Sequence, residues 1–243
     1  MPEQLWFTAL LNRLFAGPVD SLLHALGVQP AYPQAPITNF VAMQILVAAF
    51  LIAFFVLVRS RLSAEHPGGL QHIIEGAESF IKDQSHQVIG PHSEGYTAFL
   101  VALGFFILAC NLIGMIPGFD SPTAVPSVPL GCALVAFFYY HVQGLKKSGL
   151  GYFKHFAGPF LWMAPLMFPI EIISHLARVL SLTVRLFANM FAGDMVTLVF
   201  FSLIPIGIPI AFLGLHIGVS LLQTYIFVLL TTVYLQGAVG EEH

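Results

Sequence analysis

The sequence has 243 residues, of which 57% are hydrophobic and only 9% are charged, and its net charge is −3. A soluble domain carries about a quarter charged residues, so this composition provides too little polar surface for a protein in water. It indicates an integral membrane protein, and the negative net charge argues against binding to nucleic acid. Cys110 and Cys132 lie in apolar runs and are interpreted as packing residues rather than as a disulfide or metal ligands.

Residues 1–36 are expected to form an external N-terminal segment. From Trp6 to Leu26 the chain is moderately apolar but contains Arg13, Asp20 and His24, which predicts a short segment at the membrane surface. Three prolines then keep the chain extended before the first span.

Residues 37–58 contain no charged side chain and are long enough to cross a hydrocarbon core of ~30 Å as a helix. Residues 97–116, which include Asn111, form a second predicted span, and residues 128–143 a shorter third one. A proline-rich loop, Pro117–Pro129, is expected between the second and third spans. Between the first and second spans, residues 70–89 place apolar side chains at helical spacing and charged ones on the remaining faces. This pattern predicts an amphipathic helix that lies on the membrane or against a partner.

The C-terminal part, from Phe156 to Val239, is almost continuously apolar. Two pairs of prolines delimit helices over residues 169–204 and 209–237, which would be roughly 50 and 40 Å long. Both lengths exceed the hydrocarbon core, so a steeply tilted hairpin is predicted. The predicted fold is therefore all-α: a single polytopic membrane domain with about five transmembrane helices and one amphipathic helix on the cytoplasmic surface.

The nine basic residues predict the orientation, because loops rich in Lys and Arg stay in the cytoplasm. In the predicted topology the basic residues of the loops all lie on one side of the membrane, except for Arg13. Those that share one side are Arg59, Arg61, Lys82, Lys146, Lys147 and Lys154. We expect the N-terminus outside and both the amphipathic helix and the C-terminus in the cytoplasm.

The predicted hairpin contains polar side chains that are unusual within a membrane. A charge at the bilayer centre costs ~3 kcal/mol on insertion scales, so such residues must face protein or water and are functional candidates. They are Glu171, His175, Arg178, Arg185, Asn189 and Asp194 in the first helix and His216 and Gln223 in the second.

Helical spacing sorts these candidates into groups. Glu171, Arg178, Arg185 and Asn189 share a narrow stripe, whereas Asp194 lies half a turn away from Arg185. Counting back from the hairpin turn pairs Asp194 in depth with His216, and Arg185 with Gln223. Glu171 would lie about 20 Å further toward the cytoplasm than Arg185.

This layout is suited to moving protons. Asp194 and His216 can line an aqueous path from outside, and Glu171 a separate path from inside. Arg185 keeps its charge between the two paths, so it blocks a direct leak and favours the ionised form of a carboxyl group on a partner.

Structural roles remain open for several of these residues. Arg178 can snorkel to the interface or neutralise Glu171, and His175 can be a satisfied interface histidine rather than a relay. Asn111 and Asn189 can be interhelical hydrogen-bond residues, and Gln223 either such a residue or a partner for Arg185. An Arg185–Asp194 ion pair is a further alternative, which the half-turn offset disfavours.

The segment Ser181-Leu-Thr-Val-Arg185-Leu-Phe-Ala-Asn189-Met-Phe-Ala-Gly193-Asp194 closely resembles the signature of the F-type ATP synthase subunit a family, Ser-Leu-x-x-Arg-Leu-Phe-Gly-Asn-Met-x-Ala-Gly-Glu. Further similar segments are Pro169-Ile-Glu171, Asn111-Leu-Ile-Gly-Met-Ile-Pro117, and His216 with Gln223-x-Tyr-Ile-Phe-Val-Leu-Leu. The sequence departs from the pattern at Asp194, where Glu is usual, at Ala188, where Gly is common, and at Val179, where Pro is frequent.

The resemblance implies a proton-conducting stator subunit in the bacterial plasma membrane. Arg185 matches the essential arginine that faces the rotating ring of subunit c, and Asn189 and Gln223 match its polar neighbours. Asp194 and His216 match the outer half-channel, and Glu171 the cytoplasmic one. Ser181, His175, Arg178 and Asn111 are secondary candidates. The implied partners are the c-ring, the subunit b peripheral stalk, the remaining synthase subunits, lipid and the transported protons.

No catalytic site and no cofactor are expected on this chain, because it contains no G-x-x-x-x-G-K-[ST] nucleotide loop. Two other classes compete with the stator interpretation. A secondary transporter would often show two similar halves with broken helices, and an intramembrane hydrolase could use Asp194 and His216 as an acid–base pair. The sequence has no repeat, no G-x-S-x-G and no H-E-x-x-H, which disfavours both classes.

Overall fold

The computed structural model describes residues 5–25, 27, 32, 35–60, 62, 68–116, 118–149, 152, 164–203 and 208–240. The regular secondary structure of this part of the chain consists of seven α-helices and two single 3-10 turns. Five of the helices are long and apolar enough to cross a membrane. The predicted all-α membrane fold is therefore confirmed.

The helices follow the predicted order. Before the first span lies α1 (Trp6–Ala25), which is followed by α2 (Asn39–Ser60) and the amphipathic α3 (Gly69–Ile89). The second and third spans are α4 (Glu94–Ile113) and α5 (Ser127–Ser148), and the hairpin consists of α7 (Ala164–Leu203) and α8 (Ile208–Val239). The predicted turn at residues 205–209 lies largely outside the described residues.

Several helices begin before their predicted first residues, and in α5 and α7 the difference concerns a proline that was expected to delimit the helix. The predicted loop ends at Pro129, but α5 begins at Ser127, because a proline in the first turn of a helix sacrifices an N–H that has no helical partner. Similarly, α7 begins at Ala164 and contains Pro169. That proline removes one backbone hydrogen bond close to the N-terminal end without ending the helix.

The N-terminal helix α1 is attached to the start of α2 through one polar side chain. Asn12 is buried, and its amide donates to the Ile37 carbonyl at 3.0 Å and accepts from the Ile37 N–H at 3.0 Å. Both backbone groups precede the first turn of α2, where helical partners are missing. One asparagine therefore fixes how the two helices meet.

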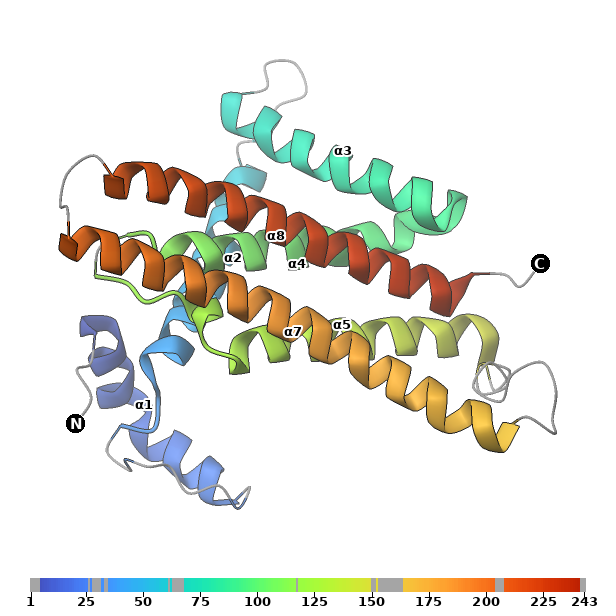
Figure 1. Cartoon of the computed structure of the whole chain (residues 1–243), viewed down its shortest axis with the longest axis horizontal. Coiled ribbons are helices and arrows are strands. Elements are labelled where there is room, and N and C mark those ends of the chain that lie inside the picture. Colours follow the sequence, from blue (N-terminus) through green and yellow to red (C-terminus); the bar gives the residue numbers. More distant parts are fainter. Residues whose placement is uncertain are drawn as a thin grey trace.

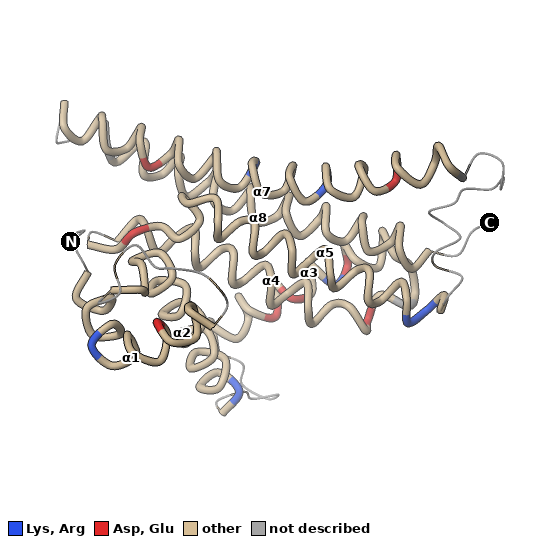
Figure 2. The backbone as a smooth tube through the Cα atoms, turned by 90° about the horizontal axis from the view of Figure 1, so that it is seen from below, with Lys and Arg blue, Asp and Glu red and all other residues tan. Residues whose placement is uncertain are grey.

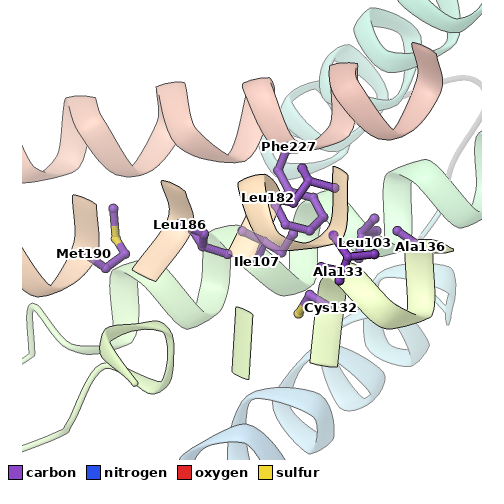
Figure 3. Packing of buried hydrophobic residues seen from close by; sticks show 10 residues of the cluster. Leu103, Ile107, Cys132, Ala133, Ala136, Leu182, Leu186, Met190 and Phe227 are labelled. Atoms are coloured by element: carbon purple, nitrogen blue, oxygen red, sulfur yellow. The ribbon is translucent and has the colours of Figure 1, made fainter. Parts of the chain in front are cut away.

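Four helices, α4, α5, α7 and α8, lie alongside one another, and α2 crosses them at a steep angle (Figure 1). The amphipathic α3 packs on α4 and α8. A close-packed cluster joins the four aligned helices (Figure 3) and includes Leu103, Ile107, Cys132, Ala133, Leu186, Met190 and Phe227. Cys110 and Cys132 are both free and buried, as the packing interpretation predicts.

Of the long hairpin, α7 is the less covered helix. Only 11% of the most apolar stretch of α7 is buried, against 33% of the corresponding stretch of α8 and 39% of those of α4 and α5. Charged residues nevertheless occur along its length, as Figure 2 shows. This combination of an uncovered apolar helix and internal charges singles out α7 as the element that carries the site.

Candidate functional site

Arg185 lies near the middle of α7 and is partly exposed. Its Nη2 donates to the Ser181 hydroxyl, one turn earlier, at 3.3 Å. The ion pairs formed within the described residues do not include Arg185. A guanidinium with one weak neutral acceptor inside a membrane span has most of its five donors available to a partner outside the chain.

Toward the hairpin turn, Asp194 meets His216 of α8. The distance from His216 Nε2 to Asp194 Oδ1 is 3.7 Å, and the His216 ring is buried. The predicted pairing in depth is thus confirmed, and the alternative ion pair between Asp194 and Arg185 is not formed. The residue before Asp194 makes the approach possible, because a Cβ on Gly193 would lie 3.0 Å from the His216 Cε1 atom.

Asn189 lies one turn beyond Arg185 and donates through Nδ2 to Gln223 Oε1 at 2.8 Å. The alternative role of Gln223 as an interhelical hydrogen-bond residue is therefore confirmed, and the prediction that it lies roughly level with Arg185 stays a prediction. Gln223 is buried, and its Nε2 has no hydrogen-bond partner within the described part of the chain.

At the N-terminal end of α7, Glu171 pairs with His175, one turn later. Glu171 Oε1 lies 3.3 Å from His175 Nε2, and His175 Nδ1 lies 2.9 Å from the hydroxyl of buried Tyr140 on α5. The satisfied-histidine interpretation of His175 is thus confirmed in geometry. The suggestion that Arg178 neutralises Glu171 is not confirmed. The Arg178 guanidinium lies over the Tyr234 ring, 5.2 Å from its centroid.

A polar cavity of about 90 Å³ adjoins these groups and is lined by Glu171, His175, Arg178, Tyr152 and Tyr234, together with the backbone near Gly237. Tyr152 follows α5, and burial raises the pKa of its hydroxyl, an effect that Arg178 opposes and Glu171 reinforces. This volume is large enough for water.

Sequence reasoning missed the aromatic residues of this region, Tyr140, His141, Tyr152 and Tyr234. Tyr140 and His141 are adjacent near the C-terminal end of a predicted span. The signal that could have found them is the occurrence of consecutive polar aromatic residues in an otherwise apolar helix. Such residues need hydrogen-bond partners when buried.

Asn111 joins three elements through its amide. It donates to the Thr224 hydroxyl at 3.3 Å and the Ser220 carbonyl at 3.4 Å on α8, and it accepts from the Thr123 hydroxyl at 2.8 Å. Both Asn111 and Asn189 are thus interhelical hydrogen-bond residues, as one of the alternatives predicted.

The fold and the site define a multi-pass helical membrane protein with separate acidic sites and an arginine on one long hairpin. Comparison with known proteins specifies the family. A family model described as "ATP synthase A chain" matches residues 41–236. The chain belongs to this family, so it is a subunit of an ATP synthase and part of a translocase complex, as the motifs around Arg185 predicted.

Three similar proteins match between 82% and 100% of the length of this chain. The "ATP synthase subunit a" of Koribacter versatilis is 58% identical over 244 residues, which is 100% of both chains. The protein of the same name from Solibacter usitatus is 50% identical over 96% of this chain and 100% of its own length. "ATP synthase subunit a 3" of Pelobacter propionicus is 41% identical over 82% of this chain and 86% of its own.

Proposed function

We propose that this chain conducts protons between two half-channels and a ring of subunit c in a bacterial plasma membrane. The observation that carries this proposal is the position of Arg185, a charge on the least covered helix of the hairpin that forms no ion pair within the described residues. A charge at the centre of a bilayer costs ~3 kcal/mol or more, so it requires a partner. A carboxylate on a ring subunit supplies one.

The two carboxylates of α7 support separate entry and exit paths. Asp194 and Glu171 are 23 residues apart on one helix, which is about 35 Å at 1.5 Å per residue. Each has a histidine neighbour, His216 near the hairpin turn and His175 at the opposite end. Groups so far apart cannot exchange protons directly, so transfer between them requires a moving carrier.

The proposed cycle uses the ring as that carrier. A proton enters from outside past Asp194 and His216 and neutralises a ring carboxylate, which can then turn into lipid. After nearly a full rotation the proton leaves along Glu171. Arg185 holds the ring carboxylate ionised between the two paths, because a positive charge favours the charged form of an acid. Asn189 and Gln223 align the two helices beside it.

The proposed orientation follows the distribution of basic residues. The N-terminus and the hairpin turn lie outside, and α3 and the C-terminus lie in the cytoplasm. The faces of α2 and α3 that the chain leaves exposed are then available to subunit b of the peripheral stalk and to lipid.

The test is ATP-driven proton pumping in membrane vesicles that contain the Arg185→Ala variant of the complete synthase. Pumping should fall to background while the complex remains assembled, because the ring carboxylate loses its counter-ion. Arg13→Ala removes an exposed arginine outside the hairpin and serves as the matched control. Near-normal pumping by an assembled Arg185→Ala complex would rule out the proposed role.

A further inference from the structure

Three side chains from two helices form a continuous polar chain at the cytoplasmic end of the hairpin. The Tyr140 hydroxyl of α5 lies 2.9 Å from His175 Nδ1, and His175 Nε2 lies 3.3 Å from Glu171 Oε1. Tyr140 is 2% exposed and His175 is 8% exposed, so neither can exchange its partner for bulk water. The three groups follow one another in the order hydroxyl, imidazole and carboxylate. Each donor must face an acceptor, and this restricts the positions of the protons.

Ionised Glu171 determines the tautomer of His175, and the Tyr140 hydroxyl complements that tautomer. A carboxylate only accepts hydrogen bonds, so the nitrogen that faces it must carry a proton. That nitrogen is Nε2, which leaves Nδ1 as the acceptor for the phenolic O–H. A neutral imidazole with the opposite tautomer would place a lone pair against the carboxylate and leave the buried hydroxyl without its acceptor.

A second imidazole and a guanidinium lie close to His175. The ring of His141 is 4.7 Å from the ring of His175, centroid to centroid, and His141 Nδ1 is 3.3 Å from the Tyr152 hydroxyl. Arg178 lines the same cavity as His175. A protonated His175 would share this buried site with the Arg178 guanidinium, which carries the same charge.

We infer that Tyr140 and His175 are a positioning pair, which directs one N–H at Glu171 and holds its carboxylate on the wall of the polar cavity. This inference rests on the proposed function, in which Glu171 passes protons to the cytoplasm. His175 acts through Glu171, and Tyr140 acts through His175. The role needs a hydrogen-bond acceptor and a donor on one side chain, and it does not need a titrating imidazole.

The experiment measures passive proton conductance through the membrane sector after removal of the soluble ATPase, with the amount of assembled complex as the reference. His175→Leu should lower conductance about fivefold, which is the effect of losing one hydrogen bond of ordinary strength. His175→Gln should restore most of it, because an amide can accept from Tyr140 and donate to Glu171. Tyr140→Phe should give a smaller loss.

Two further variants separate positioning from packing. If Tyr140 acts through His175, the double variant Tyr140→Phe/His175→Leu should conduct no less than His175→Leu alone. Tyr139→Phe is the matched control, because that neighbouring ring stacks on Phe99 at 3.7 Å and lies outside the chain of three. Equal losses in the Gln and Leu variants, or additive losses in the double variant, would overturn the inference.

The outcome is distinguishable from failure of the proposed function. If Arg185→Ala abolishes pumping while His175→Leu conducts normally, the stator mechanism stands and the positioning pair does not. If Arg185→Ala pumps normally, the proposed function fails whatever His175 does.

Discussion

At the scale of single residues, the site depends on side chains whose partners lie on another helix. Asp194 has His216, Asn189 has Gln223, and Glu171 reaches Tyr140 through His175. Arg185 differs, since it donates to the Ser181 hydroxyl on its own helix. Within a membrane, where water cannot replace a missing partner, this difference supports the proposal that Arg185 acts on another molecule.

Gly193→Ala should impair the outer half-channel without removing any polar group. The added Cβ would lie 3.0 Å from His216 Cε1 and 3.1 Å from Nδ1, so the ring must shift by a few tenths of an ångström. Since a displacement of about 1 Å can cost up to ~100-fold in a reaction, we expect ATP-driven pumping to fall by about tenfold. Gly214→Ala on α8, where a new Cβ meets nothing within 4 Å, is the control and should pump normally.

Asn111→Leu should destabilise the protein, because the buried Thr123 hydroxyl loses the Asn111 acceptor. We expect a loss of about 1–3 kcal/mol, measured as a lower thermal midpoint of the purified complex in detergent. Replacing both partners, as in Asn111→Leu/Thr123→Val, should recover part of this loss. If the double variant is less stable than Asn111→Leu, the hydrogen bond is not the source of the effect.

At the scale of elements, a few polar contacts decide how apolar helices meet. Apolar side chains gain little from association inside lipid, so hydrogen bonds and close packing set the geometry. Asn12 of α1 holds the backbone of Ile37 before α2, and Asn111 of α4 holds α8. The remaining contact surface is the cluster of small and branched residues shown in Figure 3.

Asn12→Leu should release α1 from α2. Both backbone groups of Ile37 lose their side-chain partner, while the apolar body of α1 is preserved. We expect faster proteolysis of the N-terminal segment in vesicles that expose its side, with pumping retained. Arg13→Leu changes the exposed neighbour and should leave the proteolysis rate unchanged.

At the scale of the whole molecule, the chain is an incomplete packing unit. Helix α2 crosses the four aligned helices (Figure 1), and only 11% of the most apolar stretch of α7 is buried. The molecule is therefore built to be completed by lipid on some faces and by other subunits on others. The least covered helix is also the one with internal charges, which is consistent with its facing the ring.

The proposed orientation can be tested by thiol labelling, because both native cysteines are buried. Ser148→Cys, at the exposed end of α5, should react with an impermeant maleimide in inverted vesicles only. Ser21→Cys, exposed on α1, should react in right-side-out vesicles only. Reaction of both positions from the same side would contradict the predicted topology.

The sequence by itself determined the helical class, the order of the spans and the residues that carry charge into the membrane. Long apolar runs can only form helices in lipid, and charges there are too costly to be incidental. The Arg185 motif was sufficient to indicate the family. The pairing of Asp194 with His216 also followed from spacing, because both lie near the same turn.

Only the tertiary structure decided which side chains meet further from that turn. Gln223 accepts a hydrogen bond from Asn189, and His175 is held by Tyr140 of α5, a helix whose rotation about its own axis the sequence does not specify. Contacts between helices depend on crossing angles and axial offsets, and a shift of a single turn exchanges one partner for another. Helical periodicity determines the face of a residue, whereas packing between helices determines its neighbour.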